Sequence, residues 1–140
     1  MRDHRKLRAF ALAHRLVLDV YRLTRVFPSG ERYGLTAQIR RAAVSIPSNI
    51  VEGSARDSVL EYIRFLEMAY GSSIEVEYQL ELAKELALVT DQNYRATIEL
   101  ARNTAMTLNS LVRALRNRAH KRSSLLPEAR RLRPFYALAC

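Results

Sequence analysis

Cysteine and tryptophan are almost absent from this sequence: the only cysteine is the last residue, Cys140, and there is no tryptophan. One cysteine cannot form an internal disulfide, so the chain fits a reducing compartment and we expect a cytoplasmic location. Glycine and proline number four each, which argues against a turn-rich β fold. No run approaches the roughly 18 apolar residues of a membrane span, and the basic start leads into no signal sequence. We therefore expect no membrane partner.

Acidic residues are scarce at both ends of the chain and concentrated in its middle. Residues 1–56 hold eleven Lys/Arg and four Asp/Glu, residues 57–99 hold three and nine, and residues 100–140 hold nine and one. A basic surface favours phosphate backbones or acidic proteins as partners. Alternatively, an acidic helix offsets basic neighbours within the fold. The charge count leaves both interpretations open.

Apolar residues recur at spacings of three and four along most of the 140 residues, which predicts amphipathic helices. Four such stretches cover about residues 7–26, 31–53, 58–89 and 91–119, with short connections between them. Together they predict an all-α, up-down-up-down four-helix bundle over residues 1–119. Residues 120–140 are then a basic, flexible C-terminal tail. The first helix is expected to pack through Phe10, Ala13, Val17, Val20, Thr24 and Phe27.

The second predicted helix contains a proline and organises the rest of the chain. Pro47 lacks an N–H and crowds the carbonyl of Ala43, so we expect a kink or a break there. Ser45, Ser48 and Asn49 could bond the freed backbone groups. The start is left open between Glu31, Gly34 and Thr36, and Gly53 is a plausible stop. The expected core stripe of this helix is Leu35, Ile39, Ala42, Ile46 and Ile50.

Capping residues indicate where the third and fourth predicted helices begin. Ser58 followed by Glu61 predicts a capping box at the start of the third helix. Thr90 and Asp91 mark the start of the fourth helix, with Asp91 the expected cap. Gly71 lies among small residues in the third helix, which predicts a close crossing with the region around Pro47.

A second apolar stripe accompanies the first on helices two to four, and one small bundle cannot bury both. Such a face is typical of a helical oligomer. The stripe comprises Val44, Val51, Ile63, Tyr70, Ile74, Leu82, Leu86, Met106 and Leu111.

Two segments resemble a known family: YGLTAQIRRAAVSIPSNIVEG at 33–53 and EYIRFLEMAYGSSIEVEYQLELAKEL at 61–86. They are similar to bacterial four-helix bundle proteins encoded in intervening sequences of large-subunit ribosomal RNA genes. The likeness covers about residues 10–89 and is weaker through the fourth helix. It implies a ring-like homopentamer with no established enzymatic activity. The motif residues expected to be structural are Pro47, Asn49, Glu52 and Gly71.

The same family is similar to the accessory variability proteins of diversity-generating retroelements. Those proteins are basic pentamers that bind nucleic acid and a reverse transcriptase. The resemblance therefore implies RNA or DNA, and a reverse transcriptase, as partners. The segment after about Arg118 is longer and more basic than the family pattern, which leaves its role open.

Basic residues are the candidate binding groups. Of the adjacent pair Arg40 and Arg41, one is expected to point inward, because neighbouring helical residues diverge by about 100°. It could contact phosphate, or pair with Glu52, Glu75 or Glu77. The basic run from 113 to 133 could likewise contact phosphate or remain a solvated tail. The predicted nucleic-acid contacts are Arg113, Arg116, Arg118, Lys121, Arg122, Arg130, Arg131 and Arg133, with Arg22, Arg25, Arg40 and Arg41 on the first two helices.

No pattern of residues predicts catalysis. His4, His14 and His120 are scattered, and no Glu-x-x-His motif or Cys/His cluster is present. Ser45 and Ser48 have no acid or histidine at a recognisable spacing, and no glycine-rich phosphate loop occurs. We therefore expect no catalytic residue, metal or cofactor. The leading hypothesis is a non-enzymatic oligomer that binds nucleic acid; the alternative is a structural or protein-interaction module.

Overall fold

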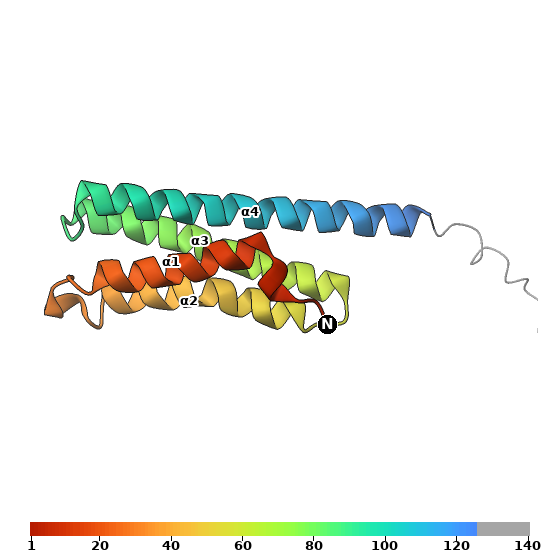
Figure 1. Cartoon of the computed structure of the whole chain (residues 1–140), viewed down its shortest axis with the longest axis horizontal. Coiled ribbons are helices and arrows are strands. Elements are labelled where there is room, and N and C mark those ends of the chain that lie inside the picture. The colour runs from red at the N-terminus through yellow and green to blue at the C-terminus, as the bar shows by residue number, and fades with distance from the viewer. Residues whose placement is uncertain (126–140) are drawn as a thin grey trace, which may run out of the picture.

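The computed structural model describes residues 1–125, and helices are the only regular secondary structure in that range. The four long helices are α1 (Arg8–Thr24), α2 (Leu35–Ser54), α3 (Val59–Glu85) and α4 (Asp91–Ser124). Two short 3-10 turns, η1 (His4–Lys6) and η2 (Ser29–Glu31), precede α1 and α2. Successive helices run in opposite directions (Figure 1), which confirms the predicted up-down-up-down bundle. The pentamer stays a prediction.

Each helix packs against two neighbours around one core. Contacts are most extensive between α2 and α3 and between α3 and α4, while α1 lies against α2 and α4. The diagonal pairs α1/α3 and α2/α4 do not meet in the described bundle, so the helices form a four-sided arrangement. The largest fully buried aliphatic side chains come from all four helices: Leu16, Ile39, Ile46, Ile50, Leu66, Leu80 and Leu108.

The predicted core stripe is confirmed on α2 and mostly confirmed on α1. On α1, Ala13, Val20, Thr24 and Phe27 are buried, whereas Phe10 and Val17 are only half-buried against the core. The core of α1 also includes Ala9, Leu16 and Leu23, which the predicted stripe did not contain. The buried face is therefore wider than the predicted stripe.

Helix α2 continues through Pro47, so of the two predicted outcomes the break is wrong and the kink stays a prediction. The Ser48 hydroxyl donates to the Val44 carbonyl at 2.8 Å, and the Asn49 amide donates to the Ser45 carbonyl at 2.9 Å. Neither bond reaches the Ala43 carbonyl, which is the group that Pro47 leaves without its helical donor. The prediction that these side chains bond the freed group is therefore not confirmed.

The helix ends follow the capping signals with two exceptions, Gly53 and Asp91. Gly53 is not the stop of α2, because the helix continues to Ser54. Gly34 precedes α2, and the Glu31 carboxylate accepts the Leu35 N–H at 3.0 Å. The Ser58 hydroxyl accepts the Glu61 N–H, as predicted. Asp91 is not the cap of α4: it is the first helical residue, and the Thr90 hydroxyl accepts the Asn93 N–H at 3.2 Å. In the first turn the Asp91 charge favours the helix N-terminus instead.

The glycine at the close approach of α2 and α3 is Gly53 and not Gly71, although Ser72 beside Gly71 does meet the region around Pro47, as predicted for this small-residue patch. A Cβ atom on Gly71 would meet nothing within 4 Å, because this residue is exposed. A Cβ atom on Gly53 would lie 2.6 Å from the Cβ of Phe65. The hydroxyls of Ser45 and Ser72, 2.7 Å apart, join the two helices nearer their middles.

Helix α4 is longer than its predicted extent. Its last buried residue is Val112, yet it continues to Ser124, beyond the end of the other helices (Figure 1). Residues 120–124, predicted to belong to a flexible tail, are therefore helical. The rest of the predicted tail lies outside the described residues, apart from Leu125.

Candidate nucleic-acid interface

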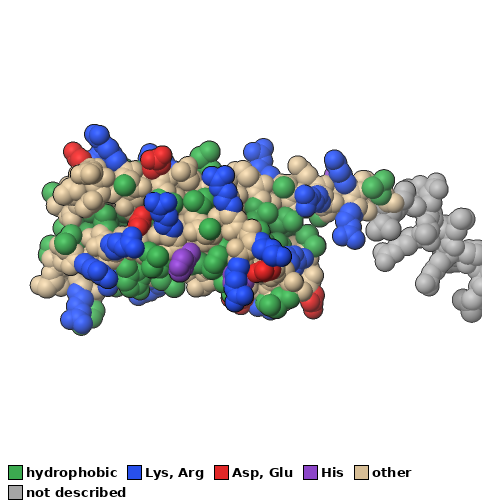
Figure 2. All heavy atoms as spheres, viewed as in Figure 1, with side chains coloured by type: hydrophobic (Ala, Val, Ile, Leu, Met, Phe, Trp, Pro, Cys, Tyr) green, Lys and Arg blue, Asp and Glu red, His purple; other side chains and the backbone are tan. Residues whose placement is uncertain are grey.

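The first concentration of positive charge is the basic end of α4, defined here as Arg113, Arg116, Arg118, Lys121 and Arg122. All five side chains are exposed, and no Asp or Glu occurs from 100 to 125. Figure 2 shows Lys and Arg side chains around the part of α4 that extends past the bundle. The basic end of α4 is thus a cationic rod in solvent.

This rod is helical for local reasons. Arg, Lys, Ala and Leu, which dominate residues 113–122, are strong helix formers. Lys121 and Arg122 lie in the last turn, where positive charge complements the helix dipole. Because each residue advances by about 100°, the five charges are distributed around the helix and do not form one face.

Part of the positive charge of α4 is offset by α3. Arg116 pairs with Glu67, and Arg102 lies 3.9 Å from Glu77 and 3.7 Å from Glu81. The other four members of the basic end of α4 have no carboxylate within 4.0 Å among residues 1–125. They are therefore the candidates for phosphate contacts.

The second concentration of positive charge lies where α2 meets α1, and Arg40 is its most ordered member. The Arg40 Nε donates to the Thr24 hydroxyl at 2.8 Å, and that hydroxyl donates to the Val20 carbonyl at 2.8 Å. The guanidinium carbon lies 4.6 Å from the centre of the Tyr21 ring. Arg40 is half-buried while Arg41 is exposed, which confirms that one of the pair points inward.

The glutamates proposed as partners of Arg40 have other contacts, so that prediction is wrong. Glu52 pairs with Arg56 at 2.9 Å. Glu77 faces Arg102 on α4, as above, and Glu75 accepts from the Gln79 amide at 3.2 Å. The actual partners of Arg40, a threonine and a tyrosine on α1, carry no opposite charge, so its positive charge is not neutralised.

A cleft of about 520 Å³ opens beside Arg40, and we call it the α1/α2 cleft. No Asp or Glu lines it. The Arg32 guanidinium carbon lies 5.6 Å from the centre of the Tyr33 ring. Sequence reasoning found Arg40 and Arg41 but missed the other members, because no periodic signal links the end of α1 to the turn before α2. The polar and aromatic side chains that line the cleft are Tyr21, Arg32, Tyr33, Thr36, Arg40 and Arg41.

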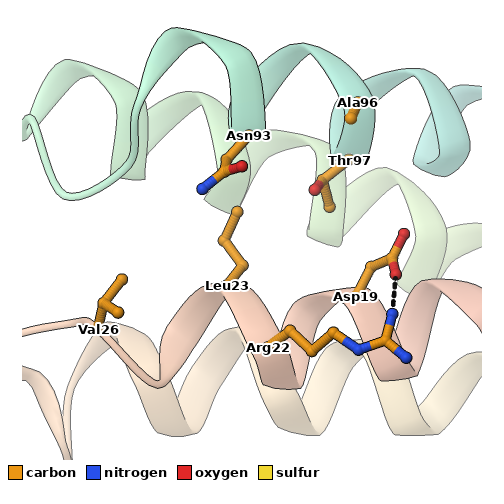
Figure 3. Close-up of a pocket in the computed structure, with 7 residues that line it drawn as sticks. All are labelled: Asp19, Arg22, Leu23, Val26, Asn93, Ala96 and Thr97. Carbon is orange, nitrogen blue, oxygen red and sulfur yellow. Dashed lines mark hydrogen bonds and ion pairs between the residues drawn. The ribbon is translucent and has the colours of Figure 1, made fainter.

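The two arginines predicted on α1 differ in their surroundings. Arg22 turns toward Asp19 at 3.1 Å beside a hollow of about 300 Å³ between α1 and α4, where Asn93 and Thr97 face it (Figure 3). This pairing offsets its charge. Arg25 lines a neighbouring hollow of about 440 Å³ that shares Tyr21 with the α1/α2 cleft.

Among residues 1–125, two groups have a clearly shifted pKa, and neither lies in these basic regions. Burial raises the pKa of Glu77, although Arg102 opposes the shift. Burial also raises the pKa of Tyr62, against the opposing effects of Ser54 and Arg2. Both pKa shifts therefore reflect the burial of these side chains in the packed bundle.

Two further features of the described part of the chain bear on function. Within residues 1–125 no three His, Cys, Asp or Glu side chains gather in a way that could hold a metal ion. None of the four helices, as far as they are described, is long and apolar enough to cross a membrane.

Residues 5–110 match the model of a family described as 23S rRNA-intervening sequence protein. The chain belongs to this family. The matched range includes every residue of the α1/α2 cleft, whereas the basic end of α4 lies beyond it. No curated protein matches this intervening-sequence protein.

Among solved structures, the chain is similar to a protein of unknown function from the S23 ribosomal protein family of Bacteroides thetaiotaomicron. The two are 22% identical, with a TM-score of 0.70, over 75% of this chain and 95% of that one. At this identity the likeness shows the fold alone, and the bundle is shared over nearly the whole length of the Bacteroides protein.

Proposed function

We propose that this intervening-sequence protein is a non-enzymatic, cytoplasmic bundle that binds RNA or DNA through basic surfaces. The observation that carries the proposal is the basic end of α4, where four exposed cations, Arg113, Arg118, Lys121 and Arg122, have no carboxylate within 4.0 Å among residues 1–125. A rod of this kind suits the phosphate backbone, whose contacts are electrostatic and independent of sequence. The α1/α2 cleft adds a second basic surface.

Self-association is part of the proposal. Six residues of the predicted second apolar stripe are exposed, while Ile63 belongs to the core and Leu82 and Leu111 are half-buried. A homopentamer would cover such residues and present the basic end of α4 five times, so weak contacts would add through avidity. The exposed members are Val44, Val51, Tyr70, Ile74, Leu86 and Met106.

A role beside a reverse transcriptase in a retroelement remains a proposal that rests on the resemblance to accessory variability proteins. The competing function is a structural or protein-interaction module, which the exposed apolar residues would equally serve. Nucleic-acid binding separates the two, because a purely structural module has no need of the unpaired cations on α4.

The test is binding of the full-length protein to labelled single-stranded RNA and duplex DNA at about 50 mM salt. A variant with Arg113, Arg118 and Arg122 changed to Gln should bind both at least about tenfold more weakly, because up to three phosphate contacts are lost. The matched control changes Arg64, Arg95 and Arg15, which are exposed on other surfaces, to Gln. Its affinity for both nucleic acids should stay much closer to that of the unchanged protein. No binding by the unchanged protein would favour the structural alternative.

A further inference from the structure

The α1/α2 cleft combines fixed positive charge with accessible aromatic rings. Three arginines and two tyrosines line it without an acidic side chain. Charge alone suits any anion, but guanidinium groups beside open ring faces suit a ligand with both phosphates and planar bases. Nucleic acid has both, whereas an acidic peptide offers carboxylates without an obligatory flat ring.

The phosphate-binding part of the cleft is ordered before any ligand arrives. Arg40 is held in place by its Nε bond to Thr24 and by the Tyr21 ring, and it lines the cleft. The bond to Thr24 does not involve its two Nη groups. Arg guanidinium groups bind phosphate through paired hydrogen bonds, and a preordered one loses less side-chain entropy. Arg41, one residue further along α2, places a second cation on the same cleft.

The base-binding part is Tyr33, which is 87% exposed just before α2. Such exposure leaves the ring free to take a further partner while Arg32 lies beside it. Bases in a duplex are already stacked on each other, so a lone tyrosine can stack only on a base that is unpaired.

We infer that the α1/α2 cleft binds single-stranded nucleic acid, with a phosphate on Arg40 and Arg41 and an unstacked base on Tyr33. This inference rests on the proposed function. It assigns to the protein a second nucleic-acid site, which prefers single strands. The basic end of α4 contacts any phosphate backbone, whereas the cleft distinguishes a single strand from a duplex.

The experiment compares a labelled, unstructured RNA of about 20 nucleotides with the same strand annealed to its complement. Tyr33→Ala in the full-length protein should weaken binding of the single strand by about 5- to 100-fold and leave the duplex within about twofold. Tyr33→Phe should retain single-strand binding, because the ring is kept. The matched control is Tyr78→Ala on α3, where the ring is 62% exposed outside the cleft, and it should change neither affinity.

Three results would overturn the inference. If Tyr33→Ala bound the single strand as tightly as the unchanged protein, the cleft is not the site, while the proposed function would stand. If the unchanged protein bound neither probe, both would fail. If light scattering showed that Tyr33→Ala alters the oligomeric mass, the cleft would be a contact between copies of the chain. Tyr33 lies outside the helices, so the variant should fold normally, and its melting curve checks this.

Discussion

The arginines of the α1/α2 cleft and those of the basic end of α4 carry the same charge in different surroundings. Arg40 is half-buried, bonded to Thr24 and stacked on Tyr21. Arg118 and Arg122 project from a helix that has left the bundle. The charge along a sequence therefore predicts that a surface attracts anionic ligands. The packing around each charged side chain decides whether that side chain can also orient the ligand.

The two surroundings also differ in entropy. An exposed arginine loses roughly 2 kcal/mol of side-chain freedom when a ligand fixes it, whereas Arg40 has lost part of that freedom on folding. The cleft is therefore suited to selecting a ligand by shape. The basic end of α4 is suited to rapid attraction that tolerates any sequence.

The largest expected effect concerns the packing of α2, which carries Arg40, against α3. Gly53→Leu should destabilise the protein by about 2–3 kcal/mol, because even a Cβ atom would lie 2.6 Å from the Cβ of Phe65. Urea unfolding followed by circular dichroism measures the loss. Gly71→Ala is the matched control and should be neutral or stabilising by up to about 1 kcal/mol, since it adds a better helix former in open space. Equal effects at the two glycines would contradict this packing.

The next largest effect compares the two arginine regions by the same Arg→Lys substitution in each. Arg40→Lys keeps the charge but loses the Nε bond to Thr24 and the planar group on Tyr21, so single-stranded RNA should bind about fivefold more weakly. Arg118→Lys, in solvent, should change affinity by less than about twofold. Fluorescence anisotropy on the full-length variants measures both. If the two substitutions behaved alike, the ordering of Arg40 would have no role in binding.

The smallest expected effect concerns pH. The pKa of Glu77 is raised above its ordinary value of 4.5 by burial, so between these two values the folded state holds more protons than the unfolded state. Stability from this group is therefore present at low pH and falls as pH rises through the raised pKa. Glu77→Gln should remove this decline, as measured by urea unfolding at pH 4 and pH 7. An unchanged pH dependence in the variant would refute the assignment to Glu77.

The sequence predicted the bundle well where apolar periodicity is unambiguous. Leu35, Ile39, Ala42, Ile46 and Ile50 all lie in the core, as their spacing indicated. The same reasoning was less exact for α1, where Ala13, Val20, Thr24 and Phe27 are buried but Phe10 and Val17 are only half-buried. The contacts of α1 with α2 and α4 decide which residues at the edge of its apolar face are covered.

The site was predicted less completely than the fold. The basic end of α4 and the pair Arg40 and Arg41 could be found from the sequence, but Arg32 was missed. The contact between Arg40 and Thr24 joins residues 16 apart and depends on how α2 packs on α1. Gly71 and Gly53 show the same limit. Both lie in helices, and only the position of Phe65 on the neighbouring helix makes one indispensable and the other replaceable.

The salt dependence of nucleic-acid binding tests the central claim most directly. For the full-length protein and single-stranded RNA, the logarithm of the binding constant should fall linearly with the logarithm of salt concentration. The expected slope is about −3 or steeper, because each phosphate contact contributes about −0.7. Changing Arg113, Arg118 and Arg122 to Gln should make that slope shallower by about 2. A slope shallower than about −1 in the unchanged protein, or no binding at about 50 mM salt, would contradict an electrostatic nucleic-acid interface.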